Sequence, residues 1–503
     1  MENSTEQVIA VLDIGKTNKK VALFDRHLKM LDSRRRRIDA VTAEGLQVED
    51  VETIHTWFLD QLTELSGSFD IRAIAITTHG AASVCVGEDG NPVVPPVDYT
   101  QPVEDSLHER FFAEMGTPED LQVTTATAEV RPLINVGKAL FFLKERFPER
   151  FARIKHVLLY PQYFAWRLTG IAAADITYAG CHSYLRDYGR EDWSHVVDRL
   201  GIRHALPEKP VLSTETIGTI TAEIAERTGL SPDVIVTAGI HDSNASLLPY
   251  LITRTKDFVL NSTGTWCVAM HPVERVDFTP DEVGKMVFYN LSYAGKPVKT
   301  SILMGGLEYE TYRRILTEHH KRTDEPAINV PLLTEIVSRA DTFILPSVVR
   351  GTGQFPDSVA RVVEGDRTTL LEEIEAGRAM PKAFEEYERA LALVDISVAI
   401  QSVIALERVG LKKGTEVFIE GGFRNNKPYL AILSALLPDN PVALTSVEEA
   451  TSFGAALCAR AALDGKPVEA LADTVTMEIQ PVEQLQLPGI GRYQDRFVEL
   501  VRS

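Results

Sequence analysis

The chain has 503 residues, with 44% hydrophobic and 24% charged side chains and a formal net charge of −19. This length exceeds what one hydrophobic core usually supports, so we expect a globular protein of two large domains or a few smaller ones. The acidic charge argues against nucleic acid or an anionic membrane as a partner, because both need a basic surface. A bound polyphosphate would need local neutralisation, for which Lys16, Lys19, Lys20 and a divalent metal are the candidates.

The cysteines and the N-terminus bear on the cellular compartment. The four cysteines form neither a CxxC motif nor a zinc spacing, which favours reduced thiols; they are Cys85, Cys181, Cys267 and Cys458. The opening residues MENSTEQ contain no apolar signal core, and no run approaches the roughly 18 apolar residues of a membrane span. We expect a cytoplasmic protein, and the sequence leaves its oligomeric state open, a homodimer included.

Strand-like and helical patterns alternate in the first half of the chain, which predicts an α/β fold. The strand-like runs are 8–12, 21–24, 72–77, 157–159 and 234–237, and the helical stretches are 51–65, 134–146 and 161–168. The basic run from Arg34 to Arg37 lies in a strand-like segment between acidic neighbours. We expect it to be a solvated strand face.

The first two apolar runs are joined by a short polar turn. Asp13 ends the first run, Gly15, Thr17 and Asn18 form the turn, and Lys20 opens the second run. Backbone N–H groups and a Thr hydroxyl in such a turn can cradle phosphate oxygens, and an adjacent Asp can hold hydrated Mg²⁺. The segment indicates a nucleotide phosphate clamp, and the alternative is an ordinary β-hairpin. A P-loop is excluded because its first Gly is replaced by an Ala and a strand follows the turn.

Polar residues follow other predicted strands of the first half. His79 and Gly80 end one strand and are followed by small residues, while Asp98 and Tyr99 follow a Val-Pro-Pro run. Hydrogen-bonding groups on such rigid edges suit a hydroxylated substrate. For His79 the alternative is a structural histidine with satisfied nitrogens.

Asp242 is the leading candidate for chemistry. It follows an apolar strand and precedes a helix that we expect to begin near Ser243. Its carboxylate should therefore lie at the carboxyl edge of a sheet, where ligands gather in open α/β folds. Position alone also allows Asp242 to be a simple helix cap.

The second half repeats the first design. The segment 244–255 contains a Pro and a short apolar run, so we place the main domain boundary near residue 250, giving domains 1–249 and 250–503. The segment 257–271 is again two apolar runs around a polar turn, which contains Gly264 and Thr265. A helical stretch at 385–409 precedes the strand 417–420, which ends in Gly421 and Gly422 and leads to Asn425. Two such hairpins suggest duplicated domains facing each other across a nucleotide.

Taken together, these motifs resemble the FGGY carbohydrate kinases, within the superfamily of actin, the heat-shock chaperone ATPases and hexokinase. The resemblance runs through almost the whole chain in the expected order. Its motifs are the Asp13-x-Gly15-x-Thr17-Asn18 clamp, His79-Gly80, the Asp175/Thr177/Trp193 region, Pro207 through Gly218, Gly239-x-x-Asp242, Ser262-Thr263-Gly264-Thr265, Gly421-Gly422 and Glu448 to Ala456.

The resemblance implies two ribonuclease H-like (actin-like ATPase) domains around a central cleft, with sugar bound mostly by the first and ATP by the second. It gives Asp242 the general-base position, with a share in the metal site, and turns Asp13 and the Gly15/Thr17 clamp toward Mg²⁺ and the transferred phosphate. The remaining residues it implies are His79, Gly80, Asp98 and Tyr99 for the sugar, and Asn18, Lys20, Gly264, Thr265, Gly421, Gly422 and Asn425 for the nucleotide.

The turn before Trp266 is similar to that of kinases for 6-deoxyketoses, although Trp266 could equally be a core aromatic. The resemblance therefore implies an ATP-dependent ketose kinase, acting on L-fuculose, L-rhamnulose or a related sugar at a terminal or C1 hydroxyl. One alternative is a kinase for xylulose or a polyol. Another is an ATP-driven binding protein of the actin or chaperone kind, which would need neither His79 nor Asp242 facing a sugar.

Overall fold

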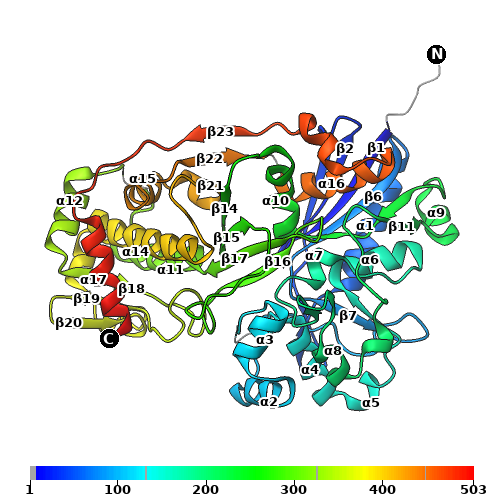
Figure 1. The fold of residues 1–503 in the computed structure, drawn as a ribbon, viewed down its shortest axis with the longest axis horizontal. Helices are drawn as coiled ribbons and strands as arrows, with labels where there is room; N and C mark the ends of the chain where they lie inside the picture. The colour runs from blue at the N-terminus through cyan, green and yellow to red at the C-terminus, as the bar shows by residue number, and fades with distance from the viewer. Residues whose placement is uncertain (1–6, 131–132, 325–326, 448) are drawn as a thin grey trace.

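The computed structural model describes residues 7–130, 133–324, 327–447 and 449–503. The opening residues that bear on a signal sequence and Glu448 of the last motif therefore lie outside the described residues. Two seven-stranded sheets organise the two halves of the chain, which lie side by side in Figure 1. The predicted α/β fold is confirmed.

The first sheet is built around β1 and its hairpin partner β2. Its strands, in spatial order, are β11 (Thr216–Thr219), β12 (Ile235–Thr237), β6 (Asp70–Thr78), β1 (Gln7–Ile14), β2 (Asn18–Asp25) and β3 (Met30–Arg37), with β13 (Ile240–His241) also beside β6. β1 runs antiparallel to β2 and parallel to β6. The carboxyl ends of β1, β6 and β13 therefore meet at one edge of the sheet.

The second sheet repeats this plan around β14. Its order is β16 (Phe288–Leu291), β17 (Pro297–Leu303), β15 (Cys267–Pro272), β14 (Phe258–Thr263), β21 (Glu416–Gly421), β22 (Val442–Ser446) and β23 (Glu478–Pro481). β14 runs antiparallel to β15 and parallel to β21, as β1 does with β2 and β6. The repeated hairpin predicted from the sequence is therefore present as a repeated sheet topology.

Helices cover both sheets. In the first half they are α1 (Val51–Ser66), α2 (Asp105–Met115), α3 (Pro118–Thr125), α4 (Val136–Arg146), α5 (Pro148–Phe151), α6 (Tyr160–Thr169), α7 (Ile176–Ala179), α8 (His195–Leu200) and α9 (Ala222–Thr228). In the second half they are α11 (Gly305–His320), α12 (Val330–Arg339), α13 (Leu371–Glu375), α14 (Tyr387–Arg408), α15 (Lys427–Leu436) and α17 (Ile490–Arg502). α10 (Asp242–Thr253) and α16 (Ala450–Asp464) connect the halves.

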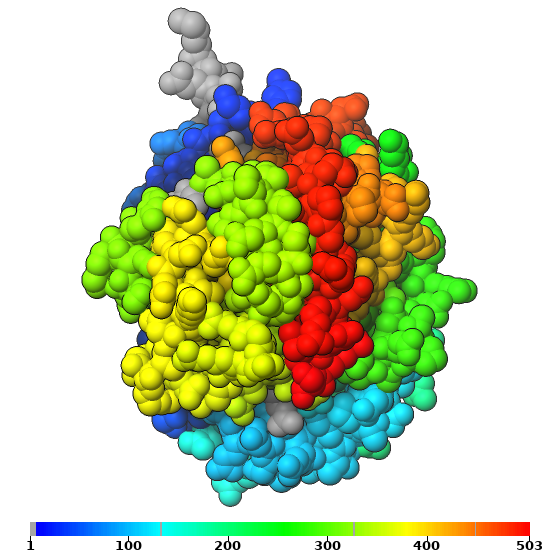
Figure 2. Space-filling view, turned by 90° about the vertical axis from the view of Figure 1, so that its left-hand side faces the viewer, coloured from blue at the N-terminus to red at the C-terminus, as the bar shows by residue number. Residues whose placement is uncertain are grey.

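Smaller strands complete the fold. The pairs are β4 (Val41–Ala43) with β5 (Leu46–Val48), β7 (Ser83–Val86) with β8 (His156–Leu159), and β9 (Arg186–Asp187) with β10 (Asp192–Trp193). A three-stranded sheet joins β18 (Thr342–Leu345), β19 (Arg361–Glu364) and β20 (Arg367–Leu370). The segment from β23 to α17 runs along the surface of the second half (Figure 2). There α17 packs against α12 and α15.

The strand β1 has two buried faces, which its continuous apolar sequence requires. Val8, Ala10 and Leu12 pack in the core that includes α1 and α6, whereas Ile9 and Val11 pack in the cluster that includes α16. α10 in turn packs on the second sheet and against α16. The two helices thus lie between the two sheets and join them (Figure 1).

Two helices bear on the sequence-based expectations. Pro249, which helped to place the domain boundary, lies inside α10, and the division at residue 250 stays a prediction. Among the described residues, α14 passes the length and composition of a membrane span, but 89% of its most apolar window is buried inside the structure, as expected of a core helix.

Candidate active site

A cavity of about 480 Å³ lies between the two halves. The turn after β1, the end of β6 and the start of α10 line it from the first half, and the turn between β14 and β15 lines it from the second. It brings together several residues predicted from the sequence, namely Thr17, His79, Gly80, Tyr99, Asp242, Gly264 and Thr265. We name it the central cavity.

A second, more polar cavity of about 280 Å³ shares Asp242, Ser243 and Ser262 with the central cavity. It is also lined by Gly421 and Arg424, and we name it the polar cavity. The Arg424 Nε atom is buried and has no hydrogen-bond partner among the described residues. Asp242 therefore lies where a mixed cavity and a polar cavity with an available cation meet.

The start of α10 holds Asp242 at this junction. The N-cap of the helix is His241, and the Asp242 carboxylate accepts a 2.6 Å hydrogen bond from the Ser243 N–H. The helix-cap interpretation of Asp242 is therefore wrong, because Asp242 is the first helical residue. Burial raises the pKa of Asp242 to about 6, and the nearby Asp13 carboxylate adds to the increase. A carboxylate poised near neutrality suits a general base.

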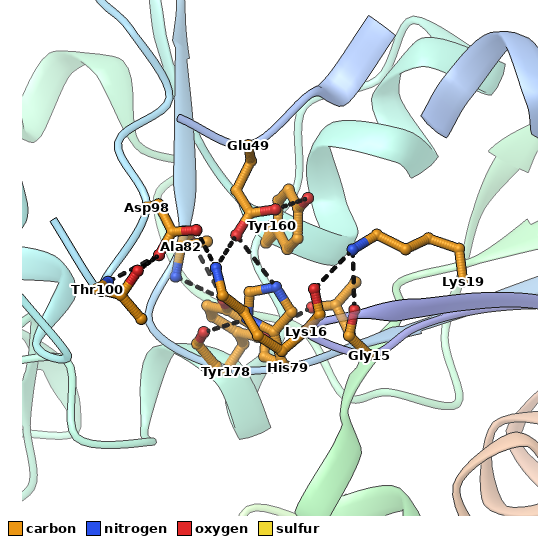
Figure 3. Close-up of polar contacts among 12 residues, drawn as sticks. Gly15, Lys16, Lys19, Glu49, His79, Ala82, Asp98, Thr100, Tyr160 and Tyr178 are labelled. Atoms are coloured by element: carbon orange, nitrogen blue, oxygen red, sulfur yellow. Dashed lines mark hydrogen bonds and ion pairs between the residues drawn. The ribbon is translucent and has the colours of Figure 1, made fainter. Parts of the chain in front are cut away.

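His79 lies in a buried polar cluster at the end of β6 (Figure 3). Its Nδ1 donates to the carbonyl of Gly80 at 2.8 Å, and its Nε2 lies 3.5 Å from a carboxylate oxygen of Glu49. Burial lowers the pKa of His79, although Glu49 opposes this decrease. Apart from this contact with Glu49, Nε2 has no hydrogen-bond partner among the described residues.

Glu49 is the centre of this cluster, and no sequence motif pointed to it. Its carboxylate accepts hydrogen bonds from Lys16 at 3.0 Å and from the Tyr160 hydroxyl at 3.2 Å. Lys16 also pairs with Asp98, which is fully buried and accepts from the Thr100 N–H at 2.7 Å. The carboxylate oxygens of Asp98 thus accept from Lys16 and Thr100. Asp98 is not among the residues that line the central cavity.

The structure pairs the lysines of the first turn with groups of the protein itself. Lys16 lines the central cavity but is paired with two carboxylates. Lys19 is fully buried, and its ammonium donates to the carbonyls of Gly15 at 3.1 Å and Lys16 at 2.9 Å. Lys19 thus holds the shape of the turn, which is closed by a bond from the Gly15 N–H to the Asn18 carbonyl at 3.0 Å.

Asp13 lies at the end of β1 and is almost fully buried. Its Oδ2 atom accepts from Lys20 at 2.9 Å and from the Ser452 hydroxyl at 2.6 Å. Lys20 also pairs with Glu449, beside α16. The last motif of the chain therefore supports the first turn through Ser452 and Glu449.

The two glycine-rich turns of the second half are tied together. The Thr263 hydroxyl donates to the carbonyl of Glu420 and accepts from the Phe423 N–H at 3.1 Å. Gly421 has a φ of +81°, and a Cβ there would lie 1.9 Å from the Thr263 carbonyl oxygen. Only glycine fits this crossing. A Cβ on Gly306 would lie 2.0 Å from the Gly264 carbonyl oxygen, so α11 supports the other turn in the same way.

Gly422 and Asn425 follow in a 3₁₀ turn and are exposed. They are not among the residues that line the central or polar cavity. A further cavity of about 490 Å³ lies beside them and is lined by Tyr309, Asn426 and Pro428.

A buried network positions the residue before Asp242. Asp175 accepts hydrogen bonds from Thr177 and from Ser213, and Thr177 in turn accepts from the His241 N–H at 3.0 Å. Burial lowers the pKa of His241 to about 3, so its ring is neutral. The sequence motif drew attention to Asp175 and Thr177 but not to His241, which lines the central cavity.

Comparisons with known proteins agree with this arrangement. The profile described as the FGGY family of carbohydrate kinases, N-terminal domain, matches residues 8–249, and that of the carbohydrate kinase FGGY C-terminal domain matches residues 255–467. The chain is 27% identical over 288 residues to an L-fuculokinase of Escherichia coli, covering 54% of this chain and 58% of that protein. It is 26% identical over 280 residues to a probable L-xylulose kinase of Pasteurella multocida, covering 53% and 56%.

These alignments span little more than half the length of the curated relatives. A solved structure matches throughout: the crystal structure of a carbohydrate kinase from Novosphingobium aromaticivorans, with a TM-score of 0.77, 28% identity and 99% of each chain covered. The predicted fold of two actin-like ATPase domains around a cleft is thereby confirmed. Because the two profiles together match most of its length, the chain belongs to the FGGY family of carbohydrate kinases.

Proposed function

We propose that this protein is an ATP-dependent sugar kinase that phosphorylates a ketose, with Asp242 as the general base. The observation that carries this proposal is the position of Asp242 between the central cavity and the polar cavity. A sugar in the central cavity and a γ-phosphoryl group in the polar cavity would both adjoin its carboxylate.

The chemistry follows from this placement. A sugar hydroxyl gives its proton to the Asp242 carboxylate as its oxygen attacks the γ-phosphorus of ATP. The bond from that phosphorus to the β,γ-bridging oxygen breaks, which yields a sugar phosphate and ADP. The proton on Asp242 then passes to solvent. The Arg424 side chain, which lines the polar cavity, is a donor available to the phosphate oxygens.

The residues present also fit Mg²⁺. Asp13 and Asp242 are carboxylates, which are the ligands Mg²⁺ prefers, and they lie close enough for Asp13 to raise the pKa of Asp242. A cation held between them would relieve this repulsion. Mg²⁺ there would neutralise charge on the transferred phosphate. We place the adenosine beside Gly421, Gly422 and Asn425, with the neighbouring cavity at Tyr309 and Asn426 available to the base.

Both halves of the chain offer unpartnered groups to a sugar. Within the described residues, His79 Nε2 from the first half and Asn290 Oδ1 from the second are buried without hydrogen-bond partners. Both residues line the central cavity, as does Tyr99. A polyhydroxylated ligand would satisfy such groups, whereas a binding protein driven by ATP would leave them unused.

The central cavity also has an apolar wall, which favours a 6-deoxyketose such as L-fuculose or L-rhamnulose. Ala81, Val130, Phe288 and Ile302 pack together there with Trp266 against them. Trp266 lines the cavity and also packs in this cluster. A methyl group at C6 fits such a wall better than a hydroxymethyl group.

A coupled assay of ADP release over a panel of ketoses tests this function. We expect kcat/KM for the preferred 6-deoxyketose to exceed that for xylulose by about 10- to 100-fold, which is the discrimination an apolar pocket provides. A preference for xylulose or for glycerol would instead support the alternative kinases. Failure of every sugar to stimulate ADP release would contradict the kinase assignment.

His79→Ala is expected to lower kcat/KM for the best ketose by about 10- to 100-fold, because a sugar hydroxyl would lose its partner in a desolvated site, at a cost of about 1–3 kcal/mol. The apparent KM for ATP should change little. His55→Ala is the matched control, since His55 is also buried with an unpartnered Nε2 but lies on α1 outside the central cavity. An equal sugar response in the two variants, with only a lower Tm, would return His79 to a structural role.

Gly306→Ala is expected to raise the apparent KM for ATP by about 10-fold or more, because its Cβ would displace the carbonyl of Gly264 in the proposed phosphate turn. Gly491→Ala is the control. Gly491 lies in α17, and a Cβ added there would meet nothing within 4 Å, so Ala should be neutral or stabilise the helix by about 1 kcal/mol. Steady-state kinetics with ATP as the varied substrate and thermal unfolding separate the two effects.

A further inference from the structure

Three side chains with metal-binding atoms come together on the wall of the central cavity. Cys181, His182 and His241 each offer one ligand atom, and these atoms all lie within 4.8 Å of one another. The sulfur of Cys181 is 3.6 Å from the Nε2 atom of His241. All three residues line the cavity, so a solvated ion can reach them through it.

The distances suit a tetrahedral zinc-type ion. Zn–S bonds of about 2.3 Å and Zn–N bonds of about 2.0 Å place the sulfur and nitrogen ligands about 3.5 Å apart. A Cβ on Gly80 would lie 2.8 Å from His241 Nε2 and 3.1 Å from His182 Nε2. Both Nε2 atoms therefore face the space beside the Cα atom of Gly80. The Cβ of any other residue at position 80 would occupy this space.

The groups behind the two rings favour ligation through Nε2. The Nδ1 atom of His182 donates to the carbonyl of Ile134 at 3.2 Å, which leaves a lone pair on its Nε2. The Nδ1 atom of His241 lies 3.3 Å from the Asn244 amide, whose Oδ1 is buried and unpartnered among the described residues. If that amide is turned over, its oxygen accepts from His241 Nδ1–H, which is the tautomer that metal binding at Nε2 requires.

We propose that Cys181, His182 and His241 form a binding site for a thiophilic divalent ion of the Zn²⁺ type. A carboxylate oxygen of Asp242 lies 3.3 Å from His241 Nε2 and is placed to be the fourth ligand. Binding releases the thiol proton of Cys181 to solvent, because the thiolate is the ligand. An ion there occupies the proposed base and part of the cavity, so it competes with the sugar; this last step rests on the proposed function.

Direct titration tests the site without sugar or ATP. Metal-free protein in a phosphine reductant is titrated with Co²⁺, whose thiolate charge-transfer absorption reports a bound sulfur, and then with Zn²⁺. We expect one Co²⁺ per chain, displaced by Zn²⁺. Cys181→Ser should weaken binding at least about 100-fold, since loss of an outer partner alone costs about 10- to 100-fold.

Two further variants distinguish loss of a metal ligand from a general effect of substitution. His182→Asn removes a second ligand, and Asn tolerates the φ of +35° at this position, so the backbone should be retained. It should weaken Zn²⁺ binding as Cys181→Ser does. Cys85→Ser is the control, because Cys85 is another buried thiol, on β7 and not among the residues lining the cavity. It should bind Zn²⁺ like the wild type.

Absence of one-equivalent binding in the wild type, or equal affinities in Cys181→Ser and Cys85→Ser, would overturn the site. In the kinase assay, Zn²⁺ should raise the apparent KM for the sugar in the wild type and much less in Cys181→Ser. Inhibition that does not depend on sugar concentration would overturn the competition. A failure of the proposed function appears separately, as the absence of ketose-dependent ADP release without Zn²⁺, and leaves the titration intact.

Discussion

Asp242→Asn is expected to lower turnover by about two to four orders of magnitude, which is the usual contribution of a positioned acid–base group. The amide keeps the shape of the carboxylate and an oxygen that accepts from the Ser243 N–H. Folding and ATP affinity should therefore be retained. Turnover measured in the coupled assay, with nucleotide affinity measured by ADP titration, gives the two quantities.

The pH profile supplies a second signature. Burial raises the pKa of Asp242 to about 6, and the base acts only when it is deprotonated. In the wild type, kcat/KM for the sugar should therefore rise with pH through about 6 and level off above it, and Asp242→Asn should lack this limb. Binding of Mg·ATP or sugar shifts the pH at which kcat/KM rises. A cation beside the Asp242 carboxylate lowers the pKa of that group and moves the rise toward lower pH.

The control for this variant is Asp25→Asn. Asp25 is a buried carboxylate at the opposite end of β2 from the turn, paired in register with Val8, and it accepts from the N–H groups of His27 and Lys29. It should change Tm and leave turnover close to wild type. Near-normal sugar phosphorylation by Asp242→Asn would remove Asp242 from the mechanism.

Local patterns along the chain predicted those parts of the fold that local chemistry determines. The two hairpins, α1 and the glycine turn after β21 occur where alternating apolar residues and turn residues indicated them. Gly421 shows why such signals are informative, because its positive φ and its close approach to Thr263 admit no other residue. Asp242 drew attention as a polar residue at the end of a strand, and the family resemblance gave it the role of general base.

Contacts between distant segments could not be read from the sequence. Glu49 belongs to no recognisable sequence motif, yet it contacts Lys16, Tyr160 and His79 and joins them into one cluster. Asp98 was a substrate-ligand candidate because it follows a Val-Pro-Pro run, and the sequence did not show that it would pair with Lys16, 82 residues earlier. Spacing along the chain encodes periodicity and turns, and it does not encode which distant charges meet once the core has formed.

The packing of α16 is another such contact. The segment was marked only as a motif of the family resemblance, and nothing in the sequence indicated that it would cross back to the first sheet. A Cβ at Gly454 would lie 1.9 Å from the Ala245 carbonyl oxygen, so glycine is what allows α16 to contact α10. Through this crossing, Ser452 reaches Asp13 from 439 residues away.

Asp13→Ala is the second variant with a large expected effect. Its carboxylate should act through Mg²⁺ and the transferred phosphate and not through the sugar, so turnover at saturating sugar should fall about 100-fold, equivalent to about 3 kcal/mol. The KM for the sugar should stay within about threefold of wild type. The Mg²⁺ concentration that gives half-maximal rate should rise.

Two measurements distinguish this metal role from a structural one. Thermal unfolding with ATP, with and without Mg²⁺, should show a Mg²⁺-dependent stabilisation in the wild type that is lost in Asp13→Ala. Ser452→Ala is the matched control, because it removes the 2.6 Å hydrogen bond to Asp13 and keeps the carboxylate and its Lys20 partner. It should cost about 1 kcal/mol of stability and leave the Mg²⁺ dependence intact. If Asp13→Ala and wild type share one Mg²⁺ titration curve, Asp13 is not a metal ligand, and its pairing with Lys20 and Ser452 is its whole role.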